Sequence, residues 1–382
     1  MKHAGRPVIK GFNGLRGVAV TMVVLTHLGF TDTITGGSRA LSFVGGGGGV
    51  LIFFALSGFL ITHLLKREYD RTGTISISNF YLRRTLRIFP LYFLVLFLTI
   101  TVSFSIYHVA SLRAIGVAAI YMTNFIPAEW YSTALGHTWT LAVEEHFYVF
   151  WPLTLSLLGF RWGRAIVLLC IFIICSIVLL NALLSIPFII SHFFVYRWTP
   201  IAGASISFGC LCALLISAPR FQFVCELIMA SSLILGVSII LFANTLFVAL
   251  FVPEPQASEM WPTDTFSYLS GQLDHYLQAV GAALLVSWVY LNQSSYVVAV
   301  LELAPLRYVG VISYGIYMWQ GFFLSTGPYR APGQLWPPNP IFGLICLSIV
   351  APLSFHFFEK PIMELKRRLI LVNGRLTLSE MR

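Results

Sequence analysis

The sequence predicts an all-α polytopic membrane protein with about ten transmembrane helices and one short re-entrant or interfacial segment. Of its 382 residues, 57% are hydrophobic, 15% are aromatic and only 10% are charged. Soluble chains carry about 25% charged residues, and disordered chains combine low hydrophobicity with high charge density. The composition therefore excludes a soluble globular enzyme and a disordered chain, and most of the polypeptide is expected to lie in lipid.

Uncharged windows of about 20 residues mark the expected helices, because a helix of that length crosses a hydrocarbon core about 30 Å thick. Two windows contain polar groups, with Arg16 and His27 in the first and Glu144, Glu145 and His146 in the fourth. In chain order the ten expected spans are residues 15–31, 44–62, 88–106, 139–158, 165–190, 198–218, 227–252, 276–298, 308–327 and 340–357.

One further apolar stretch, Ala114–Ile126, precedes Pro127. It is roughly 13 residues long, which is too short to cross a bilayer without strong distortion. It is therefore expected to be the re-entrant or interfacial segment. The run Gly45–Gly49 opens the second span, where it either lets helices approach closely or presents backbone N–H groups to a ligand path.

Loop charges orient the chain, which carries 24 Lys and Arg against 15 Asp and Glu. Short cytoplasmic loops are enriched in Lys and Arg, so the basic N-terminus, the basic loop 66–87 and the basic tail belong inside. The acidic loop Val252–His275 belongs outside. The signs agree for a chain with both termini in the cytoplasm. The expected division is an N-terminal segment 1–14, a membrane domain 15–358 and a tail 359–382. Because the excess of Lys and Arg marks cytoplasmic loops, no nucleic-acid partner is expected.

The six cysteines fall in or beside apolar runs, where thiols pack as small apolar groups. Cys210 and Cys212 are too close in sequence for the usual zinc pair, and no second Cys or His pair follows them. We therefore expect no metal site and no structural disulfide.

An ionisable group within a membrane span is costly, so it is a functional candidate. Arg16 and His27 are eleven residues apart, about three helical turns, which places them on one face with a rise of roughly 16 Å. This helical face carries a cation, Arg16, near the cytoplasmic surface and an imidazole, His27, within the membrane. The structural alternatives are a snorkelling anchor for Arg16 and a hydrogen-bonded core histidine for His27.

Glu144 and Glu145 place two adjacent carboxylates in an apolar span. Glu144 shares a helical face with Tyr148, whereas Glu145 points about 100° away. Either one glutamate orients a histidine or handles protons, or both hold helices together, and the sequence leaves open which one acts.

Arg84 and Arg87 end the basic loop and, at i and i+3, share a face that can grip a phosphate through paired guanidinium donors. Ordinary positive-inside anchoring is the alternative.

Six ordered blocks resemble the acyltransferase-3 family of integral membrane acyltransferases, and together they are more specific than any one alone. The match runs from about residue 10 to 365, and the chain ends shortly afterwards, as expected of a stand-alone form. The blocks are Asn13–Gly17 with His27, Gly49–Ile61 with its Ser57-Gly58-Phe59 core, Phe80–Pro90, Trp139–Tyr148, Ser313–Trp319 and Phe358–Pro361.

The resemblance implies acyl transfer, commonly of acetyl from acetyl-CoA or another acyl-CoA, to a sugar hydroxyl of a surface glycan or glycolipid. The family's motifs fall on Arg16 and His27, on Arg84 and Arg87, and on Glu144 and Glu145. Three positions depart from the family pattern and put roles for an acid at 51 or a histidine at 320 in doubt: Leu51, His146 and Gln320.

The expected mechanism has His27 as general base, oriented by Glu144 or Glu145, with Arg84 and Arg87 at the CoA phosphates. Arg16 either joins them in binding the donor or controls the path to the site. A covalent role for Ser57 is the minor alternative, because no base is visibly paired with it. A transporter or flippase of a lipid-linked saccharide would use the same buried charges as a pathway. A non-catalytic scaffold would tolerate their replacement by apolar residues. The expected partners are the saccharide acceptor and membrane lipid, and the sequence leaves the acceptor's identity and the oligomeric state open.

Overall fold

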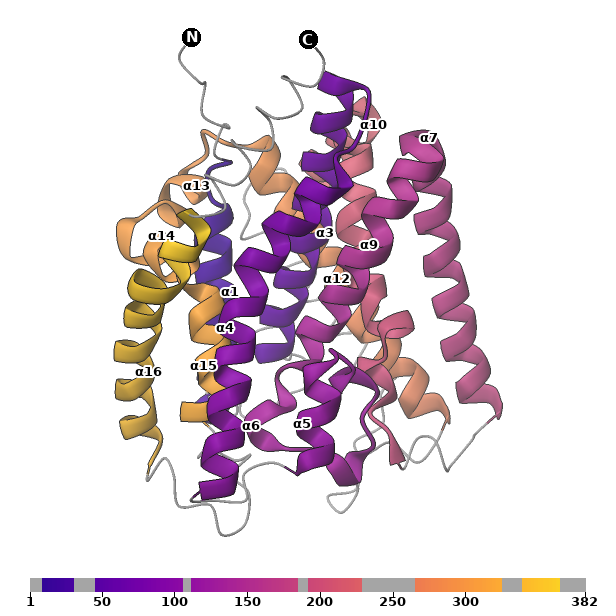
Figure 1. The fold of residues 1–382 in the computed structure, drawn as a ribbon. Coiled ribbons are helices and arrows are strands. Elements are labelled where there is room, and N and C mark those ends of the chain that lie inside the picture. Colours follow the sequence, from indigo (N-terminus) through magenta and orange to yellow (C-terminus); the bar gives the residue numbers. More distant parts are fainter. Residues whose placement is uncertain are drawn as a thin grey trace, which may run out of the picture.

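The computed structural model describes residues 9–30, 45–105, 111–184, 192–228, 265–324 and 339–364. Within these ranges almost the whole chain is helical and no β-strand occurs, which confirms the all-α class (Figure 1). The longer helices are α1 (Phe12–His27), α3 (Gly46–Thr72), α4 (Ile77–Ser105), α7 (Trp139–Leu184), α9 (Thr199–Leu215), α12 (Thr265–Leu291) and α16 (Pro340–Ser354). The shorter ones are α5 (Leu112–Ala119), α6 (Thr133–Gly136), α10 (Pro219–Ile228), α13 (Tyr296–Leu301), α14 (Ala304–Val311) and α15 (Ser313–Phe323), with single turns at η2 (Thr123–Phe125), η3 (Ala128–Trp130), η4 (Val195–Arg197) and η5 (Phe355–Glu359).

Five helical segments in the described ranges are long and apolar enough to cross a membrane, and a shorter apolar helix covers His275–Leu291. They make the chain an integral membrane protein. The five segments are Gly46–Thr72, Ile77–Val102, Ala134–Leu180, Val195–Leu215 and Pro340–Glu364.

The segment Ala134–Leu180 contains 47 residues, which as one straight helix would extend about 70 Å, more than twice the bilayer core. Gly159 interrupts it, with φ 68° and ψ 175°. Only glycine adopts this combination readily, because a Cβ would clash with the backbone. α7 therefore has two arms, and Gly159 falls at the predicted boundary between spans 139–158 and 165–190.

The other predicted boundaries agree unevenly with the structure. The stretch 114–126 forms only α5 and η2, of eight and three residues, which are too short to cross. The window 308–327 is divided, since α14 is capped at Ile312 and α15 begins at Ser313. Nearly all of window 227–252 lies outside the described residues, so the total of ten spans stays a prediction.

Close contact between α3 and α9 fixes the centre of the bundle. Gly58 on α3 faces the backbone carbonyl of Ile206, and Gly209 on α9 faces that of Ala55, so that a Cβ at either glycine would collide with the opposite backbone. Small residues at helix crossings allow this approach in membranes. The contact holds Ser57 at a defined depth beside α7.

The glycine run at the start of α3 also serves packing. A Cβ at Gly49 would collide with the Ala19 carbonyl of α1, and the Gly46 N–H donates to Thr26 Oγ1 at 2.7 Å. These contacts favour the close-approach interpretation of the run, and they hold α1 against α3.

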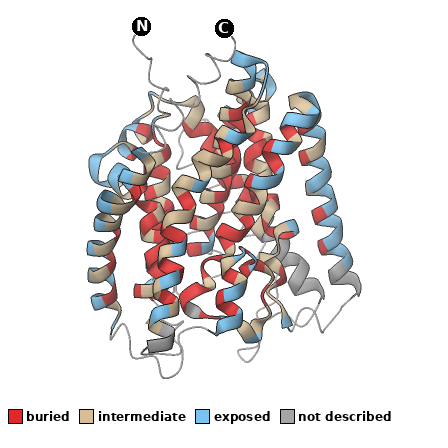
Figure 2. Cartoon of the chain, in the orientation of Figure 1, coloured by how far each residue is buried: buried red, intermediate tan, exposed pale blue. Residues whose placement is uncertain are grey.

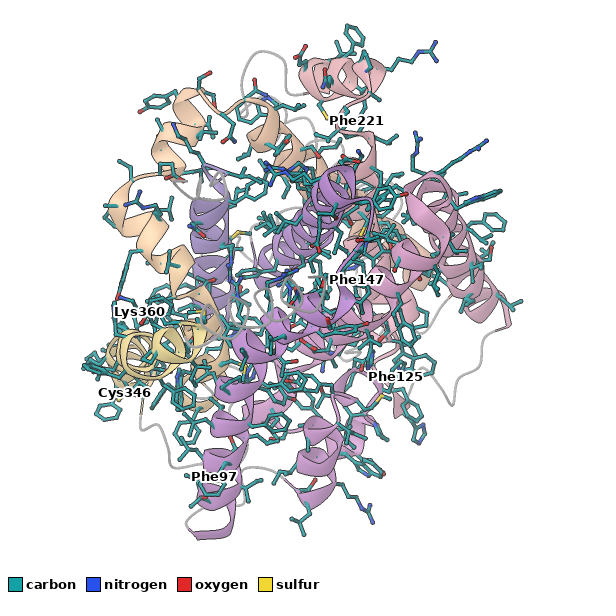
Figure 3. The ribbon with its side chains drawn as sticks, turned by 45° about the horizontal axis from the view of Figure 1, so that its top comes forward. Phe97, Phe125, Phe147, Phe221, Cys346 and Lys360 are labelled. Carbon is teal, nitrogen blue, oxygen red and sulfur yellow. The ribbon has the colours of Figure 1, made fainter. Side chains whose placement is uncertain are left out.

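Burial divides the bundle into a packed interior and an apolar exterior (Figure 2). Figure 3 shows Phe97 at the margin of the bundle, where its side chain is 63% exposed. Phe172 on the second arm of α7 and Ile341 on α16 are also exposed. Large apolar side chains on helices of this hydropathy face lipid.

Candidate active site

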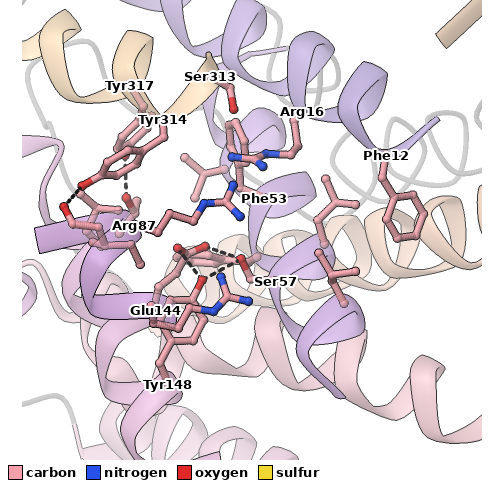
Figure 4. Close-up of a pocket in the computed structure, with 18 of the residues that line it drawn as sticks. Phe12, Arg16, Phe53, Ser57, Arg87, Glu144, Tyr148, Ser313, Tyr314 and Tyr317 are labelled. Carbon is pink, nitrogen blue, oxygen red and sulfur yellow. Dashed lines mark hydrogen bonds between the residues drawn. The ribbon is translucent and has the colours of Figure 1, made fainter. Parts of the chain in front are cut away.

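A pocket of about 140 Å³ lies where α1, α3, α4, α7 and α15 meet. We call it the inner pocket. Most of its wall is apolar, and a small set of ionisable and hydroxyl side chains converges within it (Figure 4). An apolar pocket with a few convergent polar groups is the usual form of a small-molecule site.

Three arginines enter the inner pocket from two helices. Arg16 comes from α1, whereas Arg84 and Arg87 come from one face of α4, as their spacing predicts. The Arg84 guanidinium stacks on the Tyr148 ring at 4.8 Å. In the part of the chain that the structure describes, none of the three forms an ion pair or a hydrogen bond with a protein acceptor.

A carboxylate network lies opposite the arginines (Figure 4). Ser57 Oγ donates a hydrogen bond to Glu144 Oε1 at 2.8 Å, and the Tyr148 hydroxyl donates to Glu144 Oε2 at 3.0 Å. The Tyr148 hydroxyl also lies 3.2 Å from Ser57 Oγ. Both oxygens of Glu144 are thus occupied, which fixes the carboxylate in the pocket.

The expectation that no base is paired with Ser57 is wrong. Residues 57 and 144 are far apart in sequence, and only the packing of α3 against α7 brings them together. Glu144 is therefore hydrogen-bonded to a potential nucleophile.

The charges of the inner pocket do not balance. Three guanidinium groups face the single carboxylate of Glu144. Unpaired charges in a low-dielectric site are costly, and an anion that accepts hydrogen bonds offsets this cost. The arrangement is suited to binding phosphate groups.

His27 lies elsewhere, at the last position of α1. Its Nδ1 is 2.8 Å from the backbone carbonyl of Val23, and the ring is only partly buried. It does not line the inner pocket. Because α1 is one unbroken helix from Phe12 to His27, it carries Arg16 and His27 about 16 Å apart along its axis.

A second polar region, which we call the histidine cluster, comprises His27, His137 and Tyr317. His137 is close enough to His27 for an electrostatic interaction, and its ring lies 5.6 Å from that of Tyr317. The Tyr317 hydroxyl donates to the His137 carbonyl at 2.9 Å and lies 2.6 Å from Thr140 Oγ1. Tyr317 and Thr140 also line the inner pocket, so the two regions adjoin.

Two side chains at this end of the site are buried without a well-formed hydrogen bond to any described residue. They are Gln320, at both amide atoms, and His137, whose ring nitrogens make no well-formed hydrogen bond although the backbone of Met318 lies close to the ring. Gln320 follows Tyr317 by three positions on α15 and is completely buried. Buried polar groups are normally paired, so such groups call for a ligand or a water molecule.

Sequence reasoning missed these two residues as site components. His137 stands two positions before the block Trp139–Tyr148, and Gln320 follows the block Ser313–Trp319, so their positions beside the motifs were the available signal.

Glu145 is separated from Glu144, as the 100° offset predicts. It does not line the inner pocket, and its Oε1 is buried without a partner in the described part of the chain. It lies within electrostatic range of Tyr92 and Tyr121. Of the two glutamates, Glu144 is the one beside the arginines. Among the described residues, no group of three or more His, Cys, Asp or Glu side chains is arranged to hold a metal ion.

The family model described as "Acyltransferase domain" matches residues 9–357. The O-acetyltransferase OatA of Staphylococcus aureus is 29% identical over 374 residues, which cover 93% of this chain and 57% of OatA. The peptidoglycan O-acetyltransferase OatA of Listeria monocytogenes is 28% identical over 378 residues, covering 94% and 56% of the two chains.

The protein YrhL of Bacillus subtilis is 30% identical over 376 residues, which cover 93% of this chain and 55% of YrhL. The chain thus spans a little over half the length of these relatives. No solved structure gives a significant match.

Proposed function

Because this chain belongs to the acyltransferase domain family, we propose that it transfers an acyl group, most simply acetyl, from acyl-CoA to a sugar hydroxyl of a cell-surface glycan or glycolipid. The observation that carries the proposal is the inner pocket, where three unpaired arginines adjoin a polar cluster with a histidine. The relatives' names make peptidoglycan the first acceptor to test.

Arg16, Arg84 and Arg87 bind the donor in this proposal. Each guanidinium supplies charge-assisted hydrogen bonds to phosphate oxygens, and Arg84 and Arg87 act as a pair from one face of α4. The same cations polarise the region into which the thioester carbonyl extends. Glu144 lowers the positive charge of the pocket and positions Ser57 and Tyr148.

His27 is the general base. Its imidazole takes the proton of the sugar hydroxyl while the hydroxyl oxygen attacks the thioester carbonyl. The tetrahedral intermediate then collapses, the C–S bond breaks, and the leaving CoA thiolate takes the proton from the His27 imidazolium, which yields the free thiol and restores the neutral imidazole. His137 lies within electrostatic range of His27. Its ring nitrogens and the amide of Gln320 provide hydrogen-bond donors and acceptors for the sugar hydroxyl. Glu145 lies on another face of α7 and interacts electrostatically with Tyr92 and Tyr121.

A two-step route has specific support from the hydrogen bond between Ser57 and Glu144. In that route Ser57 Oγ attacks the thioester while Glu144 accepts its proton, the C–S bond breaks, and CoA leaves as the free thiol after taking that proton from Glu144. The sugar hydroxyl then gives its proton to His27 and attacks the acyl-serine, and the released Ser57 oxygen is reprotonated. Ser57→Ala distinguishes the routes. Direct transfer retains most turnover in this variant, whereas the two-step route loses it.

The membrane arrangement proposed for this function has ten spans and both termini in the cytoplasm of a bacterial inner membrane. Residues 1–14 precede the acyltransferase domain 15–358, and residues 359–382 form a basic tail. The basic end of α3 supports this orientation, because it would place the donor site on the side that contains acyl-CoA.

The test is turnover by the purified protein in lipid nanodiscs, supplied with acetyl-CoA and de-O-acetylated peptidoglycan fragments. Free CoA thiol is titrated and the saccharide is analysed by mass spectrometry. The proposal predicts equal amounts of free thiol and new ester. If no acyl-CoA yields free thiol with these fragments or with glycans extracted from the native cell, the enzyme assignment is wrong and a transporter is favoured.

A further inference from the structure

A second and larger cavity, of about 540 Å³, adjoins the inner pocket. We call it the vestibule. Its walls are the beginning of α1, the second half of α3 and the beginning of α4, which meet in the upper half of Figure 1. The two cavities share five lining residues, which are Phe12, Asn13, Leu60, Arg84 and Arg87. Arg84 and Arg87 therefore stand at the junction between them.

The vestibule is strongly basic. Arg67, Arg71 and Arg83 line it in addition to the two arginines of the junction, and Glu68 is the one carboxylate among its lining residues. Glu68 pairs with Arg83 at 3.6 Å and also accepts a hydrogen bond from a backbone N–H at 2.9 Å. In the described ranges, Arg67 and Arg71 have no carboxylate partner. The wall thus carries a surplus of four positive charges.

Helical spacing connects this basic wall to the inner pocket. Ser57, Leu60, Leu64, Arg67 and Arg71 recur at intervals of three and four residues, so they form one face of α3. The lower part of the face lines the inner pocket and the upper part lines the vestibule. A ligand that lies along this face meets arginines first, then apolar side chains, and finally Ser57.

Positive-inside anchoring alone does not account for the arrangement. Lys66 and Asp70 also lie near the end of α3, but they pair with each other at 2.7 Å and do not line the vestibule. Arg67 and Arg71, by contrast, line a concave volume within the range of small-molecule sites, about 300–1,000 Å³. Leu64 and Phe80 add apolar surface that suits a nucleobase.

We infer that the vestibule binds the 3′-phospho-ADP part of acyl-CoA, with Arg67, Arg71 and Arg83 joining Arg84 and Arg87 at its phosphates. The pantetheine arm then passes between the two cavities at Arg84 and Arg87. It carries the thioester into the inner pocket. The inference rests on the proposed function and extends the donor site by three arginines. An anionic lipid headgroup offers the same phosphate chemistry, so the experiment separates the two sources.

The kinetic experiment compares two donors, acetyl-CoA and S-acetylpantetheine, which lacks the nucleotide and its phosphates. The double variant Arg67→Ala/Arg71→Ala should raise the KM for acetyl-CoA by about tenfold or more, with kcat nearly retained; tenfold corresponds to about 1.4 kcal/mol. The loss should be confined to acetyl-CoA. Lys66→Ala is the matched control and should behave as the parent. An equal loss with both donors, or no loss with acetyl-CoA, overturns the inference.

A binding experiment separates this inference from the proposed function, because it needs no turnover. Labelled 3′-phospho-ADP is titrated onto the protein in phosphatidylcholine nanodiscs, with phosphatidylglycerol or inorganic phosphate as competitor. Saturable nucleotide binding that Arg67→Ala/Arg71→Ala weakens and Lys66→Ala leaves unchanged supports the vestibule site, even for a protein without activity. Arginine-dependent binding of phosphatidylglycerol without nucleotide binding overturns it in favour of a lipid site.

Discussion

The inner pocket and the histidine cluster adjoin at Tyr317 but differ in which of their groups lack a bonding partner. In the inner pocket the carboxylate of Glu144 is fully hydrogen-bonded, and the unpaired groups among the described residues are the three arginines and the Ser313 hydroxyl. In the histidine cluster the unpaired groups are His137 and the neighbouring Gln320 amide, which carries no charge. An excess of cations calls for an anion, whereas unpaired neutral donors and acceptors call for a hydroxyl or a carbonyl.

This difference between the unpaired groups assigns the two substrates of a group transfer to two ends of one site. The phosphate-bearing donor matches the arginines, and the hydroxyl-bearing acceptor matches the histidines. Variants at the two ends should therefore change different kinetic constants, and the following predictions test that separation.

The largest effect is expected at His27. His27→Gln keeps much of the size and hydrogen-bonding capacity of the side chain but cannot take a proton, so acyl transfer should fall by about 10²–10⁴. The amount of detergent-stable protein should not change. His356→Gln is the control, because His356 is exposed and does not line the inner pocket; its Nε2 lies 3.1 Å from the Tyr308 hydroxyl. Near-normal turnover by His27→Gln would move the search for the base to His137 or Glu144.

A smaller effect is expected from Gly321→Ala, which probes the geometry of the histidine cluster. A Cβ at position 321 would collide with the His137 ring and the Ala134 carbonyl. Overpacking of this kind costs about 1–3 kcal/mol. Turnover should fall without a change in the KM for acyl-CoA.

Gly116→Ala is the control for that variant, because a Cβ there meets nothing within 4 Å. Thermal unfolding in detergent, measured beside turnover, compares the two glycines. If Gly321→Ala raises the KM for acyl-CoA instead, the two ends of the site are not separate.

The smallest effect is expected at Gln320. Gln320→Leu removes two buried polar atoms that have no partner in the described part of the chain, so the protein should be stabilised by on the order of 1 kcal/mol. The KM for the acceptor should rise, because the amide no longer meets the sugar hydroxyl. Gln293→Leu should instead destabilise, since its amide donates to Val289 O at 2.7 Å. A Gln320→Leu protein that loses stability would show that the amide has an internal structural role.

Local sequence patterns predicted much of the bundle. Apolar windows located α3, α4, α9 and α16, and spacing placed Arg84 and Arg87 on one face. These features depend on helical periodicity, which is a property of neighbouring residues. The stretch 114–126 was likewise predicted not to cross, from its length and from the alternation of loop charges.

Long-range packing explains what the sequence did not predict. The bond between Ser57 and Glu144 depends on how closely α3 approaches its neighbours, which Gly58 determines through its contact with α9. The division of window 308–327 at Ile312 is not visible in hydropathy, because both halves are apolar. The vestibule requires α1, α3 and α4 to diverge at one end, and no local pattern encodes that divergence.

The most direct test of the central claim is to measure acyl-CoA affinity and turnover together in two variants. Arg84→Ala/Arg87→Ala should weaken acyl-CoA binding by about 1.5–3 kcal/mol for each charged hydrogen bond lost, with lysine at either position restoring it only in part. His27→Gln should bind acyl-CoA like the parent protein and transfer almost nothing. If His27→Gln loses acyl-CoA binding, or the double alanine variant retains it, the assignment of donor and acceptor to the two ends is contradicted.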